Sequence, residues 1–335
     1  MQRSGTPVTY SLVIPLFNEE AVLPELAQRL ETLLARLDAA AEIILVDDGS
    51  TDNTRAFLRA KTSQDARFKY IGLSRNFGQQ IAMSAGMEAS SGNAVIVMDG
   101  DLQDPPELVL DMIAKWKEGY SIVNARRVSR DGDNAFKQIT AGMFYKAINK
   151  LASVRIPENV GDFRLVDRAA LDVFLKMPER DRYVRGMFAW LGFKQTIVEF
   201  DRPSRAAGET KYSVWKLVQL ALTCLIGFSD VPLRLAIWAG MSVSALALLY
   251  GIYVVSMKLL GGHAIEGWTS TMVVISFLSG INMLMTGIIG LYIGRIHGEV
   301  KQRPLYIVGE QAGFEAAADA GANIRTSRDI FARQQ

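Results

Sequence analysis

The sequence contains the stretch Val95-Ile96-Val97-Met98-Asp99-Gly100-Asp101-Leu102-Gln103-Asp104, around which the rest of the chain can be interpreted. Four apolar residues lead directly into acidic ones, which indicates a buried parallel strand with carboxylates at its carboxyl end. Ligands of open α/β sheets bind at that end of the strands. Asp99 and Asp101 alternate along the backbone, so both side chains can point the same way. Two such oxygen ligands suit Mg²⁺ or Mn²⁺ held mainly by a substrate diphosphate. The alternative is a polar turn after a strand.

The composition limits the classes of function. The chain has 335 residues, 49% of them hydrophobic, which is enough for a full core and additional apolar segments. Its net charge of +2 comes from 37 basic and 35 acidic residues, so we expect no nucleic-acid partner. The single cysteine, Cys224, excludes an internal disulfide framework. His263 and His297 are far apart in sequence, and we assign neither a metal nor a base role.

A second apolar strand, residues 10–15, ends in Pro15 and is followed by Asn18 and Glu19. A helical pattern of leucines comes next. Asn18 either caps this helix or contacts a nucleotide from the loop, and the residues alone leave both interpretations open.

Glu42 is followed by another apolar run, residues 43–46, which ends in Asp47 and Asp48. Paired acids at this position accept hydrogen bonds from a base or a ribose, or they only form a turn before the next helix. Two acidic strand ends in one α/β domain favour a shared binding site.

A further strand, residues 69–73, precedes a loop that contains Asn76 and Gly78 and then a helix over 79–90. Free backbone N–H groups at such a helix start bind anions. The chain contains neither a G-x-G-x-x-G nor a G-x-x-x-x-G-K-[ST] motif, so the dinucleotide fingerprint and the P-loop are excluded.

The alternation of strands and helices predicts an α/β fold with a mostly parallel sheet covered on both faces. A fifth strand, residues 120–124, leads into Arg126 and Arg127. The polar, Gly- and Pro-containing segment 201–211 is expected to be a loop, and it contains Arg205 and Lys211.

Together these motifs, in this order, resemble glycosyltransferase family 2, and most closely its polyprenyl-phosphate glycosyltransferases. Further matching motifs lie downstream: Asn159-Val-Gly161-Asp162-Phe163-Arg164-Leu165, Arg180-x-x-Tyr183-Val-Arg185-Gly186 and Arg205-x-x-Gly208-x-x-Lys211-Tyr212-Ser213. The resemblance covers about residues 8–308 and implies a GT-A type catalytic sheet. Gly100 departs from the alanine of many relatives, and we expect the carboxylate geometry to be unchanged.

The resemblance also implies residue roles. Asp101 and Asp162 are the expected catalytic residues, and Asp99 with Asp101 the expected ligands of Mg²⁺ or Mn²⁺. We expect Asp162 to orient a reactant and not to abstract a proton. The expected nucleotide-sugar contacts are Pro15, Asn18, Glu19, Asp47, Asp48, Asn76, Gly78, Asp99, Gly100 and Gln103. The expected contacts to the acceptor phosphate are Arg126, Arg127, Arg164, Arg205 and Lys211.

Two long segments, Leu235 to Met257 and Gly267 to Gly294, contain no charged residue. Each exceeds the roughly 20 residues that cross a bilayer, so they predict two spanning helices. Two buried core helices are the alternative. Basic residues flank the pair, while the connecting loop holds one lysine, which places both ends in the cytoplasm.

We therefore expect a cytoplasmic catalytic domain over 1–211, a two-helix anchor over 233–296 and a partly disordered cytoplasmic tail over 297–335. The basic amphipathic segments 133–153 and 212–232 are expected at the membrane interface, although 133–153 fits a core-facing helix equally well. The N-terminus lacks a signal sequence, which fits an inner-membrane protein with a cytoplasmic active site.

The resemblance implies inverting transfer of a sugar from a nucleotide-sugar to undecaprenyl or another polyprenyl phosphate. UDP-glucose is the expected donor, with GDP-mannose and UDP-4-formamido-arabinose as alternatives. A processive polysaccharide synthase is less well supported because the chain has no Q-x-x-R-W motif. An inactive nucleotide-sugar sensor is the non-enzymatic alternative. We further expect a separate flippase for the product. The sequence leaves the oligomeric state open, and small-residue faces such as those of Gly280 and Gly287 are compatible with a homo-oligomer.

Overall fold

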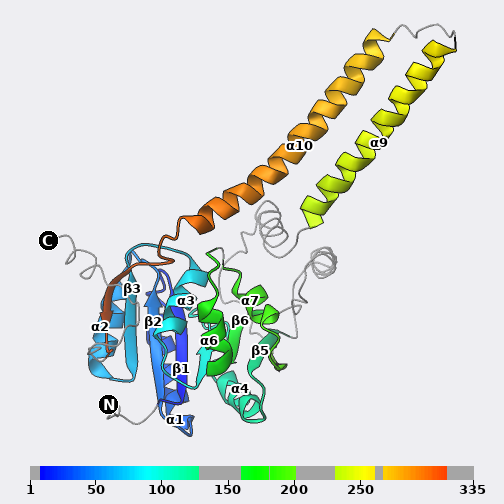
Figure 1. The fold of residues 1–335 in the computed structure, drawn as a ribbon. Helices are drawn as coiled ribbons and strands as arrows, with labels where there is room; N and C mark the ends of the chain where they lie inside the picture. The colour runs from blue at the N-terminus through cyan, green and yellow to red at the C-terminus, as the bar shows by residue number, and fades with distance from the viewer. Residues whose placement is uncertain (1–7, 128–159, 181, 201–230, 261–266, 315–335) are drawn as a thin grey trace. The chain divides into compact units, whose positions relative to one another are not determined.

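The computed structural model describes residues 8–127, 160–180, 182–200, 231–260 and 267–314 (Figure 1). The chain divides into two units. The first holds a single large sheet with its helices, and the second holds two long helices. Each unit is described by itself. The expected segments 133–153 and 212–230 lie outside the described residues, as do Arg205 and Lys211.

The sheet has eight strands in the order β7-β5-β6-β4-β1-β2-β3-β8. In chain order they are β1 (Tyr10–Leu16), β2 (Ala41–Asp47), β3 (Phe68–Leu73), β4 (Ala94–Val97), β5 (Ile122–Arg127), β6 (Val160–Asp167), β7 (Gln195–Phe200) and β8 (Val308–Ala312).

The helices of this unit connect or flank the strands (Figure 1). They are α1 (Leu23–Arg36), α2 (Thr54–Gln64), α3 (Gln79–Ala89), α4 (Leu108–Lys117), α6 (Arg168–Lys176) and α7 (Val184–Trp190).

The central strands β4, β1, β2 and β3 are parallel, and β7 is parallel to β5. Antiparallel pairing occurs where β6 joins β4 and β5, and where β8 joins β3. The sheet is thus mixed but mostly parallel, which confirms the predicted α/β class. Every residue of β1 and β4 is buried, as expected for strands covered on both faces.

Alternating residues of β1 show how the two faces are covered. Leu12 and Ile14 belong to the main hydrophobic core, together with leucines of α1 such as Leu26. Val13 points the other way, toward α3 at Gly86. Because helices cover both faces of the sheet, the carboxyl ends of the parallel strands remain accessible, and ligands of such sheets bind there. This row of strand ends is the open edge of the sheet.

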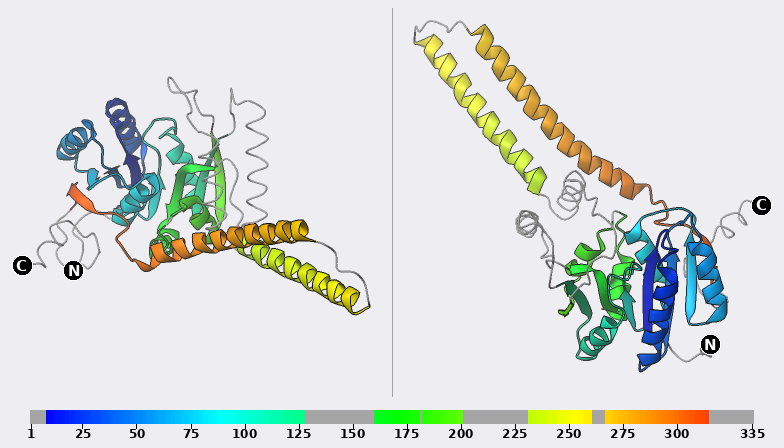
Figure 2. Two further views of the ribbon diagram at one scale, coloured as in Figure 1. Left: turned by 90° about the horizontal axis from the view of Figure 1, so that it is seen from above. Right: turned by 180° about the vertical axis from the view of Figure 1, so that it is seen from behind.

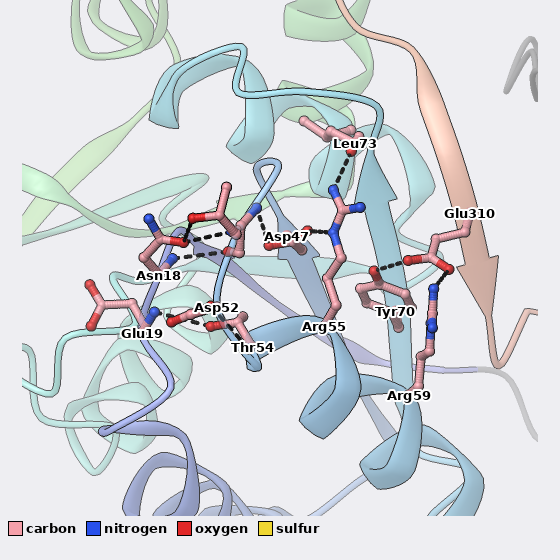
Figure 3. A network of polar contacts seen from close by, with 12 residues as sticks. Asn18, Glu19, Asp47, Asp52, Thr54, Arg55, Arg59, Tyr70, Leu73 and Glu310 are labelled. Atoms are coloured by element: carbon pink, nitrogen blue, oxygen red, sulfur yellow. Dashed lines mark hydrogen bonds and ion pairs between the residues drawn. The ribbon is translucent and has the colours of Figure 1, made fainter.

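The expected tail contains a strand of the sheet. Residues 308–312 form β8, which pairs with β3 in antiparallel register, Tyr70 opposite Ala312. Tyr70 Oη donates a hydrogen bond of 2.6 Å to Glu310 Oε1, and Arg59 also binds Glu310 (Figure 3). Residues 308–312 are thus an ordered part of the segment 297–335, which the sequence predicts to be partly disordered, because pairing with a distant strand satisfies their backbone hydrogen bonds.

The second unit contains α9 (Val231–Leu259) and α10 (Trp268–Val300), which lie side by side (Figures 1 and 2). Within them, Ala236–Tyr253 and Val273–Val300 have mean hydropathies of 1.5 and 1.9, and neither segment is buried. Both helices are long and apolar enough to cross a membrane, which is the property that the two uncharged segments predicted.

Candidate active site

The loops that follow β1 and β2 are bonded to each other through Asn18 (Figure 3). Its backbone N donates to Ser50 Oγ at 2.9 Å, and its Oδ1 accepts from Thr51 N at 2.8 Å. Asn18 has a φ of 55°, in the left-handed region that asparagine tolerates. Because α1 begins at Leu23 and has no side-chain cap, the N-cap interpretation of Asn18 is excluded.

Asp47, the last residue of β2, lies entirely inside the protein. Its Oδ2 accepts a bond of 2.6 Å from Arg55 Nε, and its Oδ1 accepts one of 3.0 Å from Ser50 N. Arg55 also donates to Leu73 O at 2.9 Å, so Asp47 joins the ends of β2 and β3 (Figure 3). Both oxygens of this expected nucleotide contact are thus engaged by protein donors.

Asp48 is also buried, and its two oxygens accept bonds from the backbone N–H groups of Phe77 and Gly78, at 2.7 and 2.8 Å. Burial raises the pKa of Asp48 above its usual value, although these two bonds act in the opposite direction. Asp48 therefore holds the turn from which α3 starts. Asn76 lies on this turn and is exposed.

Gly49 allows the loops after β2 and β3 to touch through their backbones. Its φ is +79°, and a Cβ there would lie 2.4 Å from the carbonyl carbon of Arg75 and from the N of Asn76. Only glycine fits both the conformation and the space. The Asp-Asp-Gly order at the end of β2 thus supports close contact between the two loops that carry expected nucleotide residues.

Asp99 and Asp101 follow β4 at the centre of the open edge. Burial, and then the charges of nearby Asp104, Asp162 and Asp101, raise the pKa of Asp99 to about 7. Gln79 Nε2, at the start of α3, donates to Asp99 Oδ1 at 2.6 Å. The neighbouring carboxylates thus oppose the ionisation of Asp99, and a bound cation would relieve this repulsion.

Asp101 lies between the β4 turn and the loop after β1. Its Oδ1 accepts from Gln103 N at 3.1 Å, across a turn in which Leu102 has a φ of 57°. Burial, followed by the charge of Asp101, raises the pKa of Glu19. The expected site residues Glu19, Asp101 and Gln103 are therefore brought together from two different strands.

Gly100 and Pro15 are both buried beside this turn. A Cβ on Gly100 would lie 2.4 Å from Cδ2 of Leu16. An alanine at position 100 thus requires the Leu16 side chain to move, which refines the expectation that this departure has no effect.

Asp162, in β6, is 6% exposed and is held by residues from two helices. Arg185 of α7 pairs with both of its oxygens, at 2.8 and 3.0 Å, and Gln80 of α3 donates to Oδ2 at 3.1 Å. Burial acts to raise the pKa of Asp162, but Arg185, Arg164 and Gln80 together outweigh it and leave the pKa below the usual value. A carboxylate stabilised in its ionised form is a weak base, so the geometry favours orientation over proton abstraction.

The sequence analysis did not assign roles to Gln79, Gln80, Arg185 or Asp104. Two features of the sequence could have indicated them. Arg185 belongs to one of the motifs that carry the family resemblance, and Gln79 and Gln80 directly follow Gly78, an expected nucleotide contact. Their partners, however, come from strands and helices that are distant in sequence.

The expected acceptor cations lie in different environments. Arg126 is exposed and pairs with Glu199 on the neighbouring strand β7. Arg127 ends β5 and is half-buried. Arg164 is 2% exposed and donates to Gly161 O at 2.9 Å, and burial lowers its pKa to about 10. A cavity beside Arg164 is also lined by Asn124 and Arg185. Arg164 is thus held by backbone and is not on the surface.

Among the described residues, no group of three or more His, Cys, Asp or Glu side chains is arranged to hold a metal ion by itself. The crowded pair Asp99 and Asp101 still fits a hard cation that takes its remaining ligands from a substrate diphosphate and water. The donor set therefore fits Mg²⁺ or Mn²⁺ as part of a substrate complex.

Comparisons with known proteins match this fold and these motifs. Residues 11–175 match the model of glycosyl transferase family 2. The chain is similar to the "Uncharacterized glycosyltransferase YkcC" of Bacillus subtilis, with 46% identity over 308 residues, 92% of this chain and 95% of the relative. It is also similar to the "Prophage bactoprenol glucosyl transferase homolog" of Escherichia coli, with 40% identity over 298 residues, 89% of this chain and 97% of the relative.

Among solved structures, glucosyl-3-phosphoglycerate synthase from Mycobacterium tuberculosis with UDP aligns with a TM-score of 0.43 and 19% identity, over 65% of this chain and 79% of that one. The sequence relatives decide the family, because their identity is high and extends over nearly their whole length. The chain belongs to glycosyl transferase family 2.

Proposed function

We propose that this protein transfers glucose from UDP-glucose to a polyprenyl phosphate at the cytoplasmic face of a membrane. The observation that carries the proposal is the similarity to proteins named bactoprenol glucosyl transferase, in Escherichia coli, Shigella flexneri and Shigella phages. These relatives are 38–40% identical over 89% of this chain and 96–98% of their own length. The crowded carboxylates and the two apolar helices fit a charged donor and a lipid acceptor.

On the donor side, the loops after β1, β2 and β3 hold the nucleotide. Asn18, Glu19 and the Asn76–Gly78 turn supply the direct contacts, while the buried Asp47 and Asp48 fix the positions of these loops. Asp101, with Asp99 in support, holds Mg²⁺ or Mn²⁺ on the donor diphosphate, and this cation neutralises the charge that grows on the leaving group.

On the acceptor side, the nucleophile is the phosphate of the lipid. Its second pKa is near 6, so it is mostly a dianion at pH 7 and needs no strong base. Asp162, whose pKa is held below its usual value, orients the reactants. Arg126, Arg127, Arg205 and Lys211 bind the phosphate. The buried Arg164 lies on β6, which pairs with β5, the strand of Arg126 and Arg127. Attack opposite the diphosphate inverts the anomeric carbon and gives a β-linked product from an α-linked donor.

The apolar helices anchor the enzyme where the lipid phosphate lies. Arg234, Arg295, Lys301 and Arg303 flank the pair on one side, which assigns that side to the cytoplasm. Two spans make an anchor and not a translocation path, so a separate protein is needed to move the product across the membrane.

The test is a transfer assay in detergent with undecaprenyl phosphate, Mg²⁺ or Mn²⁺ and a panel of radiolabelled UDP- and GDP-sugars. The proposal predicts that label enters the lipid phase from UDP-glucose and not after EDTA treatment. Transfer from another donor alone corrects the sugar. Metal-dependent UDP binding without transfer from any donor would contradict the proposed reaction and favour a sensor.

A further inference from the structure

We infer that Gln79 and Gln80, neighbours on the first turn of α3, are positioning residues that fix the spacing between Asp99 and Asp162. This inference rests on the proposed function, because that function assigns Asp99 to the donor side and Asp162 to the acceptor side. The two glutamines act separately: Gln79 binds Asp99 on the donor side, and Gln80 binds Asp162 on the acceptor side.

The register of the sheet explains why these two carboxylates need to be held. In the antiparallel pair of β4 and β6, Val97 lies opposite Arg164. Asp99 follows Val97 by two residues and Asp162 precedes Arg164 by two, so both carboxylates lie beyond the same end of this strand pair. Like charges that lie close together repel each other. The spacing between the two carboxylates therefore depends on groups that bind each of them.

Gln79 binds the donor-side carboxylate. Its Nε2 donates a bond of 2.6 Å to Asp99 Oδ1. Its side chain is exposed, so this amide approaches Asp99 from the solvent side of the open edge. The bond orients Asp99 without adding a charge that would compete with a cation.

Gln80 binds the acceptor-side carboxylate with one end of its amide and the backbone of α7 with the other. Its Nε2 donates to Asp162 Oδ2 at 3.1 Å, and its Oε1 accepts from Val184 N at 3.2 Å. Because a carboxylate only accepts and a backbone N–H only donates, these two partners define the orientation of the amide. Gln80 thus ties α3 to β6 and α7.

Arg185, which directly follows Val184 in α7, also binds Asp162. Its Nε and one terminal nitrogen pair with the two oxygens of Asp162, while 32% of its side chain is exposed. A bidentate guanidinium pair fixes the plane of the carboxylate, which a lysine does not.

The turn before the glutamines is itself anchored to the nucleotide side of the site. Asp48, at the end of β2, accepts from the N–H groups of Phe77 and Gly78, immediately before Gln79. Asp48 thus fixes the turn before α3, and the glutamines on the first turn of α3 bind Asp99 and Asp162. The two glutamines therefore extend from one anchored turn, and each binds a different carboxylate.

The experiment compares Gln79→Leu with Gln80→Leu by two measurements, the affinity for UDP with Mn²⁺ and the kcat and KM of transfer. A bond to a charged group is worth about tenfold or more in an equilibrium or rate. We expect Gln79→Leu to weaken UDP affinity about tenfold. Gln80→Leu should leave UDP affinity within about twofold, and should lower kcat about tenfold at an unchanged KM for the donor.

Arg185→Lys provides a second test, with Arg182→Lys as its matched control. Arg182 lies nearby in sequence, but it donates to the carbonyls of Met177 and Glu179 and lies over the Phe174 ring, away from Asp162. We expect Arg185→Lys to reduce kcat like Gln80→Leu, and Arg182→Lys to leave it within about twofold. Where Gln80→Leu does not fold, as judged by its melting temperature, Gln80→Ala replaces it.

Equal effects of the two glutamine substitutions on UDP affinity would overturn the inference, as would a wild-type kcat in Gln80→Leu. Absence of transfer in the wild-type protein would instead contradict the proposed function. In that case the contrast in UDP affinity between Gln79→Leu and Gln80→Leu still decides the inference.

Discussion

Carboxylates at the amino ends and at the carboxyl ends of the parallel strands have opposite surroundings. At the amino end of β2, Glu42 is 2% exposed and accepts bonds from Ser11 Oγ at 2.6 Å, from Ser91 N at 2.7 Å and from Lys69. Burial acts to raise the pKa of Glu42, but these donors outweigh it and leave the pKa below its usual value.

At the carboxyl end, Asp99 has other carboxylates as neighbours, and its pKa is raised to about 7. The comparison separates two uses of a buried acid. Glu42 has all the partners it needs within the fold, so its ionised form stabilises the native state. Asp99 lies among other carboxylates, whose charges a bound cation would offset, and this is typical of a functional site.

The largest expected effect is the loss of transfer in Asp101→Asn. Neutralising this carboxylate removes the expected metal ligand while preserving its shape, so transfer should fall by about 10³-fold or more. The melting temperature should not decrease, because one charge leaves a repulsive cluster. Asp111→Asn, on the exposed side of α4, is the matched control and should keep full activity. Near-normal turnover in Asp101→Asn would remove Asp101 from the site.

Glu42→Gln should have the reverse profile. It removes the charge that pairs with Lys69 in a buried position, and we expect a loss of about 2 kcal/mol in the free energy of unfolding. Activity per folded molecule should remain within about twofold, because Glu42 lies at the end of the sheet away from the site. Denaturant unfolding together with active-site titration measures both quantities. A large loss of activity at unchanged stability would reverse the comparison.

The two carboxylates should also give opposite dependences on pH. The folded pKa of Asp99 is raised, so the folded state holds that proton more tightly and stability falls as pH rises from about 4 to about 7. Asp99→Asn should therefore gain stability over the wild type as pH rises through this range, with the full gain above about pH 7 and none below about pH 4. The folded pKa of Glu42 is lowered, so its contribution is present above about pH 4.3 and is lost as pH falls below that value.

These dependences of stability on pH are measured by thermal unfolding of Asp99→Asn, Glu42→Gln and the wild type from about pH 3.5 to about pH 8. This range includes both pH limits expected for Asp99, about 4 and about 7. Parallel curves for Asp99→Asn and the wild type would mean that Asp99 is not crowded in solution.

The smallest effect is expected for the exposed pair of Arg59 and Glu310 (Figure 3). Arg59→Ala should cost less than about 0.5 kcal/mol, because exposed ion pairs contribute little. Glu310 also accepts from Tyr70, so Glu310→Ala should cost more than Arg59→Ala. Denaturant unfolding of the two variants measures this order. The reverse order would show that β8 is held mainly by its surface ion pair.

Local patterns in the sequence predicted the strands and the acids at their ends, because burial and alternation are encoded within a few residues. They did not separate Asp47 from Asp99, although both follow an apolar strand. The difference is that Asp47 pairs with Arg55, whereas Asp99 lies near the charge of Asp162. Only the packing of helices and strands brings these neighbours close. In the same way, β8 pairs with a strand about 240 residues away, since Glu310 meets Tyr70 at that separation. Pairing of this kind leaves no periodic signal in the sequence.

The most direct test of the contrast between the two ends is the change in melting temperature on adding UDP with Mn²⁺ to three proteins in detergent. A ligand that binds only the folded state stabilises it by an amount that rises with the logarithm of its concentration relative to Kd. We predict equal increases for the wild type and Glu42→Gln, each relative to its own starting point, and no metal-dependent increase for Asp101→Asn. An increase in Asp101→Asn equal to that of the wild type would contradict the account, because the crowded carboxylates would then not be the site at which the cation and the nucleotide bind.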